Sequence, residues 1–169
     1  RDRQGVGRVE RSFRKGPEDT GKREIKLRKK EKEYLLVDGY NIIFAWEDLK
    51  ALSEINMEAA RGKLMDILSN LQGALGCTLI LVFDAYRVEG GTREIFKYHN
   101  IHMVYTKEAE TADQYIEKTV HELGRKYQVT VATSDGLEQV IIMGQGASRL
   151  SASGLRELVE VTGSELRET

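Results

Sequence analysis

The sequence predicts an α/β domain with a mostly parallel sheet, and two observations lead to that prediction. Residues 34–37 and 78–83 are apolar, strand-favouring runs, and each ends at a carboxylate, Asp38 or Asp84. Between them, apolar residues recur at helical spacing up to Leu75. A strand, a helix and a second strand in this order make the βαβ unit from which parallel sheets are built.

The other predicted elements continue the alternation of strands and helices. Ser53 and Ser153 are expected to cap the first and the last helix, because serine accepts hydrogen bonds from the first helical N–H groups. The segment 86–97 carries glycines and basic residues and is expected to be a loop. The remaining elements are a strand at 101–106, a helix at 111–127, a strand at 129–133, a short helix at 137–143 and a short strand at 147–150.

Charge divides the chain into two parts. Residues 1–32 hold 13 Lys and Arg against 6 Asp and Glu, a net charge of +7, while the remaining residues hold 13 against 21, a net charge of −8. We expect residues 1–32 to form a basic, disordered arm and residues 33–169 to form the folded domain. Such an arm either binds nucleic acid through phosphate contacts or is a solvated leader.

Composition also limits the classes of protein to consider. No apolar run reaches the roughly 18 residues of a membrane span, and the first thirty residues lack the apolar core of a signal peptide. With Cys77 as its single cysteine, the chain forms neither an internal disulfide nor a cysteine-rich zinc site. We therefore expect a cytoplasmic protein without a membrane partner.

Four aspartates are expected to meet at one edge of the sheet. Asp38, Asp84 and Asp135 each follow a predicted strand, and Asp113 begins a helix that enters from the same edge. Carboxylates crowded together repel one another unless a cation holds them, and Mg²⁺ or Mn²⁺ prefers such oxygen ligands. The alternative for Asp38 is a structural one, in which it or Asn41 caps the next helix.

A divalent-metal site of this kind suits phosphodiester hydrolysis. The metal lowers the pKa of a bound water and stabilises the leaving oxygen, so no histidine or cysteine nucleophile is needed. The motifs of other phosphate-handling proteins are missing, since the sequence contains no G-x-x-x-x-G-K-[ST], no G-x-G-x-x-G and no Asp-x-Asp after the first strand.

Four short motifs carry a resemblance to a known family. They are Val-Asp-Gly-Tyr-Asn at 37–41, Val-Phe-Asp at 82–84, Thr-Ala-Asp at 111–113 and Thr-Ser-Asp-Gly at 133–136. Together they resemble the NYN domains of the PIN-like nuclease superfamily, and residues 34–168 resemble the bacterial YacP/Rae1-like family. The resemblance implies a three-layer α/β/α PIN-like fold, metal-dependent cleavage of RNA, mRNA in particular, and association with the ribosome.

The resemblance also implies roles for individual residues. Asp38, Asp113 and Asp135 are the expected catalytic and metal-binding carboxylates, with Asp84 close by as a further metal ligand. Asn41 and Ser134 are expected to orient water or phosphate.

Several other residues are candidates for contacts with nucleic acid. Arg87, Arg93 and Lys97 could clamp a phosphate backbone, or they could belong to an ordinary solvated loop. Tyr40 and Trp46 could stack on a base, although packing against a helix is the commoner fate of such a tryptophan. Arg61 and Arg149 could contact phosphate, with solvated or capping roles as the alternative.

Three functions are therefore compatible with the sequence. The first is a metal-dependent endoribonuclease that uses Mg²⁺ or Mn²⁺. The second is an RNA- or ribosome-binding module whose carboxylates no longer cut. The third is a structure-specific DNA nuclease. Cleavage assays with and without EDTA distinguish the first two functions, and a comparison of RNA with DNA substrates distinguishes the third.

Overall fold

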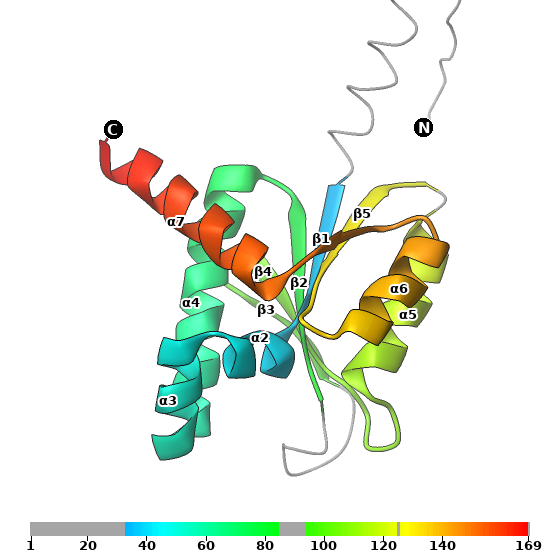
Figure 1. The fold of residues 1–169 in the computed structure, drawn as a ribbon, viewed down its shortest axis with the longest axis horizontal. Helices are drawn as coiled ribbons and strands as arrows, with labels where there is room; N and C mark the ends of the chain where they lie inside the picture. The colour runs from blue at the N-terminus through cyan, green and yellow to red at the C-terminus, as the bar shows by residue number, and fades with distance from the viewer. Residues whose placement is uncertain (1–32, 85–93, 125, 169) are drawn as a thin grey trace, which may run out of the picture. The chain divides into compact units, whose positions relative to one another are not determined.

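A six-stranded sheet forms the centre of the computed structural model, which describes residues 33–84, 94–124 and 126–168 (Figure 1). The strand order is β3-β4-β2-β1-β5-β6, and every neighbouring pair is parallel except β3 with β4. The predicted α/β fold with a mostly parallel sheet is thus confirmed. The strands are β1 (Glu33–Asp38), β2 (Thr78–Phe83), β3 (Glu94–Tyr98), β4 (Ile101–Tyr105), β5 (Gln128–Ala132) and β6 (Ser148–Leu150).

Helices cover both faces of the sheet and bury one core on each side (Figure 1). Alternate residues of a strand point to opposite faces, so in β1 Leu35 and Val37 enter one core and Leu36 the other. The first core is covered by α2 (Gly39–Ala45), α3 (Glu47–Ile55), α4 (Met57–Leu75) and α7 (Ala152–Glu168), and the second by α5 (Ala112–Leu123) and α6 (Gly136–Gly144).

The expected first helix is in fact two helices with a break between them. Asn56 is the N-cap of α4, and its side chain accepts a hydrogen bond from the Ala59 N–H at 3.1 Å. Ser53, the expected cap, lies inside α3, where its hydroxyl donates to the Lys50 carbonyl. At the last helix, Ser151 and not Ser153 accepts from the Gly154 N–H. Both expectations about caps were wrong because several polar residues compete near each helix start.

The segment expected to be a loop at 86–97 contains part of a strand. Residues 94–98 form β3, which pairs with β4 in antiparallel register, and Lys97 therefore lies on a strand opposite His102. Arg87, Arg93 and the basic arm at 1–32 lie outside the described residues.

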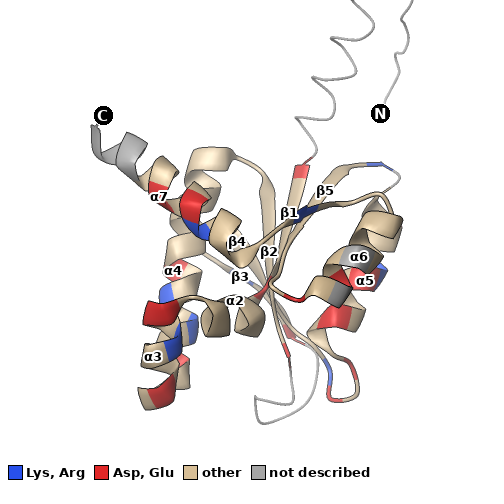
Figure 2. Cartoon of the chain, viewed as in Figure 1, with Lys and Arg blue, Asp and Glu red and all other residues tan. Residues whose placement is uncertain are grey.

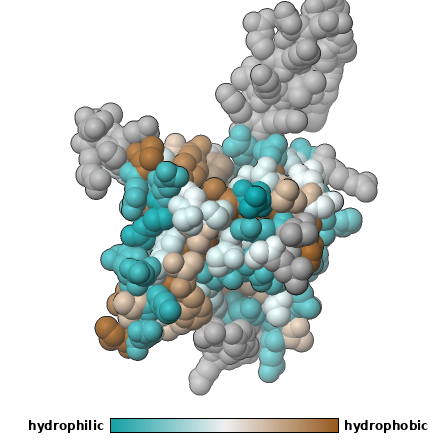
Figure 3. Space-filling view, viewed as in Figure 1, coloured by the Kyte–Doolittle hydropathy of each residue, from teal (hydrophilic) through white to brown (hydrophobic). Residues whose placement is uncertain are grey.

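The face of the described part that Figure 3 shows is largely polar. Figure 3 shows hydrophilic area across much of this face, with apolar area in separate patches. Acidic residues lie on α3, α5 and α7, as Figure 2 shows. None of the helices within the described ranges combines the length and the apolar character needed to cross a bilayer.

The turn that follows β1 depends on glycine for its packing. A Cβ atom added at Gly39 would lie 2.3 Å from Cε1 of Phe83, deep in the first core. Only a residue without a side chain therefore allows the start of α2 to pack on the end of β2.

Replacing Gly39 by Ala is expected to lower the free energy of unfolding by about 1–3 kcal/mol, because the new methyl group must displace the Phe83 ring. Urea denaturation of the purified protein measures the change. The matched control is Gly62→Ala in α4, where nothing lies within 4 Å of the added Cβ. That variant should gain stability, by up to about 1 kcal/mol, from the better helix propensity of alanine. Equal stability of the two variants would contradict the packing argument.

Candidate functional site

Asp38 is the last residue of β1 and is buried at the carboxyl edge of the sheet. Only 5% of its surface is exposed. Burial, followed by the neighbouring Asp113 carboxylate, raises the pKa of Asp38 to about 7, although hydrogen bonds from Glu138 and the Asn41 backbone act in the opposite direction. At neutral pH the Asp38 carboxyl is therefore close to half protonated in the protein without metal.

Asp113 reaches the same place from the first turn of α5. Thr111 caps this helix in a capping box, in which its side chain accepts from the Gln114 N–H and the Gln114 side chain accepts from the Thr111 N–H. Asp84, at the end of β2, accepts a hydrogen bond from the Ala112 N–H at 3.2 Å. Asp84 thus fastens the start of α5 to the sheet and thereby positions Asp113.

The third carboxylate is Glu138, which the sequence analysis did not identify. It lies in the first turn of α6 and is 2% exposed. Its Oε2 lies 3.2 Å from the Thr133 hydroxyl, whereas no hydrogen-bond partner is found for Oε1 among the described residues. Burial, followed by hydrogen bonding and charge from Asp113 and Asp38, raises the pKa of Glu138 to about 10.

Asp38, Asp113 and Glu138 together form what we call the carboxylate cluster. One carboxylate oxygen from each of the three lies within 4.8 Å of the others. Burial first, and the neighbouring carboxylates second, disfavour the charged forms of Asp38 and Glu138 and raise the pKa of each. The cluster therefore has the donor set of a site for a hard divalent cation, with the unpartnered Glu138 oxygen as one available ligand atom.

Asp135 lies next to the cluster but has a different set of contacts. Its Oδ1 accepts from the Glu138 N–H at 3.3 Å, and its own N–H donates to the Thr133 hydroxyl. Asp135 and Asp84 are outside the group of carboxylates that meet within 4.8 Å, and each accepts from an N–H group in the first turn of a helix that bears a cluster residue. Their expected role as metal ligands stays a prediction.

Asn41, in the first turn of α2, joins this helix to the loop after β5. Its Oδ1 lies 3.1 Å from the Thr133 hydroxyl and also accepts from the backbone N–H and the hydroxyl of Ser134. These bonds hold Ser134 and Asn41 together beside the cluster. The expected roles of both residues toward water, phosphate or nucleic acid stay predictions.

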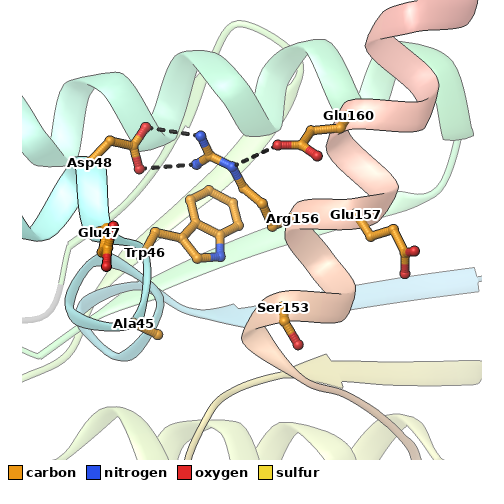
Figure 4. Close-up of a pocket in the computed structure, with 8 residues that line it drawn as sticks. All are labelled: Ala45, Trp46, Glu47, Asp48, Ser153, Arg156, Glu157 and Glu160. Atoms are coloured by element: carbon orange, nitrogen blue, oxygen red, sulfur yellow. Dashed lines mark hydrogen bonds and ion pairs between the residues drawn. The ribbon is translucent and has the colours of Figure 1, made fainter.

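A hollow of about 750 Å³ lies elsewhere, between α7 and the α2–α3 corner (Figure 4). Trp46 is buried there, donates from Nε1 to the Ala152 carbonyl at 2.8 Å and carries the Arg156 guanidinium over its ring. Arg156 in turn binds Asp48 and Glu160. Trp46 is thus a packing residue and does not offer its ring to a base, and none of the cluster carboxylates lines this hollow.

The mostly parallel sheet with helices on both faces and the carboxylate cluster define an α/β protein with a candidate metal site. Comparison with known proteins specifies the family. The model of the YacP-like NYN domain matches residues 35–169, and the chain belongs to this family. Family membership indicates a nuclease-like function related to RNA.

Individual relatives agree with this assignment. The chain is 44% identical over 129 residues to the uncharacterized protein YacP of Bacillus subtilis strain 168, which covers 76% of this chain and 75% of that protein. The crystal structure of Rae1 (YacP) from Bacillus subtilis matches with a TM-score of 0.69 and 42% identity, over 80% of this chain and 78% of that chain. The crystal structure of a mutant of the same Rae1 protein matches with a TM-score of 0.70 and 40% identity, over 80% of both chains.

Proposed function

We propose that this protein is a metal-dependent endoribonuclease that hydrolyses RNA phosphodiester bonds in the cytoplasm, with mRNA on the ribosome as its substrate. The observation that carries the proposal is the carboxylate cluster of Asp38, Asp113 and Glu138 in a NYN domain. Three acids at this spacing, two with raised pKa values, are costly to the fold, and a hard cation would remove that cost.

The residues present fit Mg²⁺ or Mn²⁺. The available donors are carboxylate oxygens, and Glu138 Oε1 is buried without a hydrogen-bond partner among the described residues. Asp38, Asp113 and Glu138 would hold the ion. When bound, such an ion supplies Lewis-acid stabilisation of a phosphoryl oxygen and lowers the pKa of a coordinated water.

The neighbouring residues position the cluster. Asp84 fixes the first turn of α5, and Asp135 fixes the first turn of α6, so Asp113 and Glu138 keep their places relative to Asp38. Asn41 and Ser134 present amide and hydroxyl groups beside the cluster, where they can hydrogen-bond to a phosphate oxygen or to water. Hydrolysis forms a bond between the oxygen of water and phosphorus, and the bond from phosphorus to one ribose oxygen breaks.

A cleavage assay with the purified full chain tests the proposal. Single-stranded RNA labelled at one end should be cut internally with Mg²⁺ or Mn²⁺ and left intact in EDTA. Faster cleavage of single-stranded DNA or a DNA flap would assign a DNA nuclease instead. Binding of RNA without cleavage in any divalent metal would assign a binding module, and either result would overturn the proposal.

The basic arm is the part of the sequence that best suits a ribosomal or other RNA surface. A variant that begins at Glu33 lacks the 13 Lys and Arg of residues 1–32. We expect its affinity for ribosomes to depend much less steeply on salt concentration, because fewer counterions are released on binding. Sedimentation with ribosomes over a range of KCl concentrations measures the slope. An unchanged slope would show that the arm does not contact the ribosome.

A further inference from the structure

A row of aromatic rings runs from α2, directly after β1, past the carboxyl ends of β2 and β4 to the middle of the antiparallel strand β3. Tyr40 packs on Phe83 with ring centroids 4.8 Å apart, Phe83 on Tyr105 at 5.6 Å, and Tyr105 on Phe96 at 5.9 Å. Phe44 stacks on Tyr40 at 6.4 Å. In the middle of the row Tyr40 and Phe83 are buried and Tyr105 is half-buried, whereas Phe44 and Phe96 at its two ends are 39% and 40% exposed. We call these five residues the aromatic row.

Phe96, one of the two exposed ends of the row, lies on the edge strand β3. In the β3–β4 register Phe96 is opposite Met103 and Glu94 is opposite Tyr105, so Phe96 faces the side of the sheet that α4 covers. Edge strands of soluble proteins usually carry polar or charged residues, because exposed apolar side chains there invite unwanted association. A phenylalanine stacked at this edge and still exposed to solvent is therefore a candidate for contact with a ligand.

A positive charge is fixed beside the row. Arg61 of α4 donates from Nη1 to the Tyr40 hydroxyl at 3.1 Å. Burial raises the pKa of Tyr105, and the nearby Arg61 guanidinium opposes this rise, so Arg61 lies close to both tyrosines. Among the described residues no carboxylate forms an ion pair with Arg61. Glu94 is the acidic group that faces the same part of the row.

One end of the row lies close along the chain to Asp38 of the carboxylate cluster. Tyr40 follows Asp38 by two residues, and the Phe83 ring is the one against which Gly39 packs. The row extends from there on the face of the sheet that α4 covers, whereas Asp113 and Glu138 come from helices on the other face. An RNA strand with its phosphate at the cluster would therefore cross the carboxyl edge of the sheet to reach Phe96. Flat rings together with a guanidinium are the groups that bind single-stranded nucleic acid, where bases stack and phosphates pair with arginine.

We propose that Phe96 and Arg61 form a binding surface for single-stranded RNA next to the carboxylate cluster, with the Phe96 ring stacked on a base and Arg61 bound to a backbone phosphate. The inference rests on the proposed function for the identity of the ligand. It adds two binding residues outside the cluster and predicts that the enzyme selects unpaired RNA, because only unpaired bases can reach the ring.

The test measures binding without turnover, in EDTA, with the full chain and a fluorescent single-stranded RNA. Phe96→Ala should weaken binding about tenfold through loss of stacking. Phe96→Trp should restore it, and Phe96→Leu should remain weak although it preserves apolar packing. The matched control is Ile95→Ala, which truncates an exposed apolar residue on the opposite face of the same strand and should leave binding unchanged.

Arg61→Gln should weaken binding about fivefold and reduce the salt slope by about 0.7, the value for one lost phosphate contact with a single strand. Lys63→Gln is its control, since Lys63 is exposed on the same helix about 200° further round. Thermal melting of each variant separates a loss of binding from a loss of fold.

An RNA with abasic sites tests the stacking contact directly. The effect of Phe96→Ala should disappear with this ligand while the effect of Arg61→Gln remains. Equal affinities of Phe96→Ala and Ile95→Ala for normal RNA would overturn the inference. Since no cleavage is needed, these results can be interpreted even if the protein fails to cut RNA.

Discussion

Replacing Asp38 by Asn is expected to lower the rate of RNA cleavage by about a hundredfold or more. Asparagine has nearly the same shape and can still accept a hydrogen bond from the Asn41 backbone, but it removes one anionic ligand from the carboxylate cluster. A divalent ion contributes several kcal/mol of transition-state stabilisation in such sites, which corresponds to rate factors of about 10² or greater. Single-turnover cleavage with saturating enzyme measures the rate of the chemical step.

The control for this variant is Asp66→Asn, which makes the same chemical change on the surface of α4. Asp66 is exposed and accepts a hydrogen bond from Tyr98, away from the cluster. Its cleavage rate should equal that of the parent protein. If Asp38→Asn cleaved RNA as fast as Asp66→Asn, Asp38 would have no part in the reaction. If a raised Mn²⁺ concentration returned the cleavage rate of Asp38→Asn to that of the parent protein, Asp38 would contribute to metal affinity alone.

The stability of the metal-free protein is expected to fall as pH rises from 5 to 8. The pKa of Asp38 is raised from 3.8 to about 7, and that of Glu138 from 4.5 to about 10. When the pH exceeds the pKa values of these two acids in the unfolded chain, the unfolded chain releases their protons while the folded protein keeps them. The folded state then binds more protons, so each retained proton costs about 1.4 kcal/mol of stability per pH unit.

This loss of stability continues until the pH passes the pKa of each acid in the folded protein, which is about 7 for Asp38 and about 10 for Glu138. Urea denaturation in EDTA at several pH values measures this slope. Glu138→Gln keeps a group that can accept from Thr133 but cannot ionise, and it should make the slope shallower and raise stability at pH 8. Mn²⁺ should stabilise the parent protein most at high pH, where it competes with fewer protons. A stability that rises from pH 5 to 8 in EDTA would contradict the burial of these acids.

Most of the fold could be predicted from local sequence patterns. The strands at 78–83 and 101–105 and the helix beginning beside Thr111 carry clear apolar periodicity and caps, and the structure contains them. β3 could not be predicted because its side chains are almost all exposed and it follows a glycine-rich basic segment. Its place in the sheet depends on pairing with β4, which local sequence does not record.

The candidate site could be predicted only in part, for a similar reason. A carboxylate directly after a predicted strand indicates a site residue, and this pattern predicted Asp38. Asp113 was predicted from its position at the start of a helix. Glu138 follows Asp135 by three residues, a spacing typical of helix capping, and its contribution to the cluster depends on where α6 begins. Conversely, Asp84 carries the same sequence signal as Asp38, yet it hydrogen-bonds the first turn of α5. Sequence position alone does not separate an acid that meets the cluster from one that supports it.

The carboxylate cluster draws on β1, α5 and α6, so its members are far apart along the chain at positions 38, 113 and 138. β1 also lies inside the sheet and pairs on one side with β5, about ninety residues later. During translation Asp38 is made before the other two acids, and the cluster can form only after Glu138 has left the exit tunnel. A nascent chain that stops before α6 therefore lacks the complete cluster, and on the proposed function it is expected to be inactive.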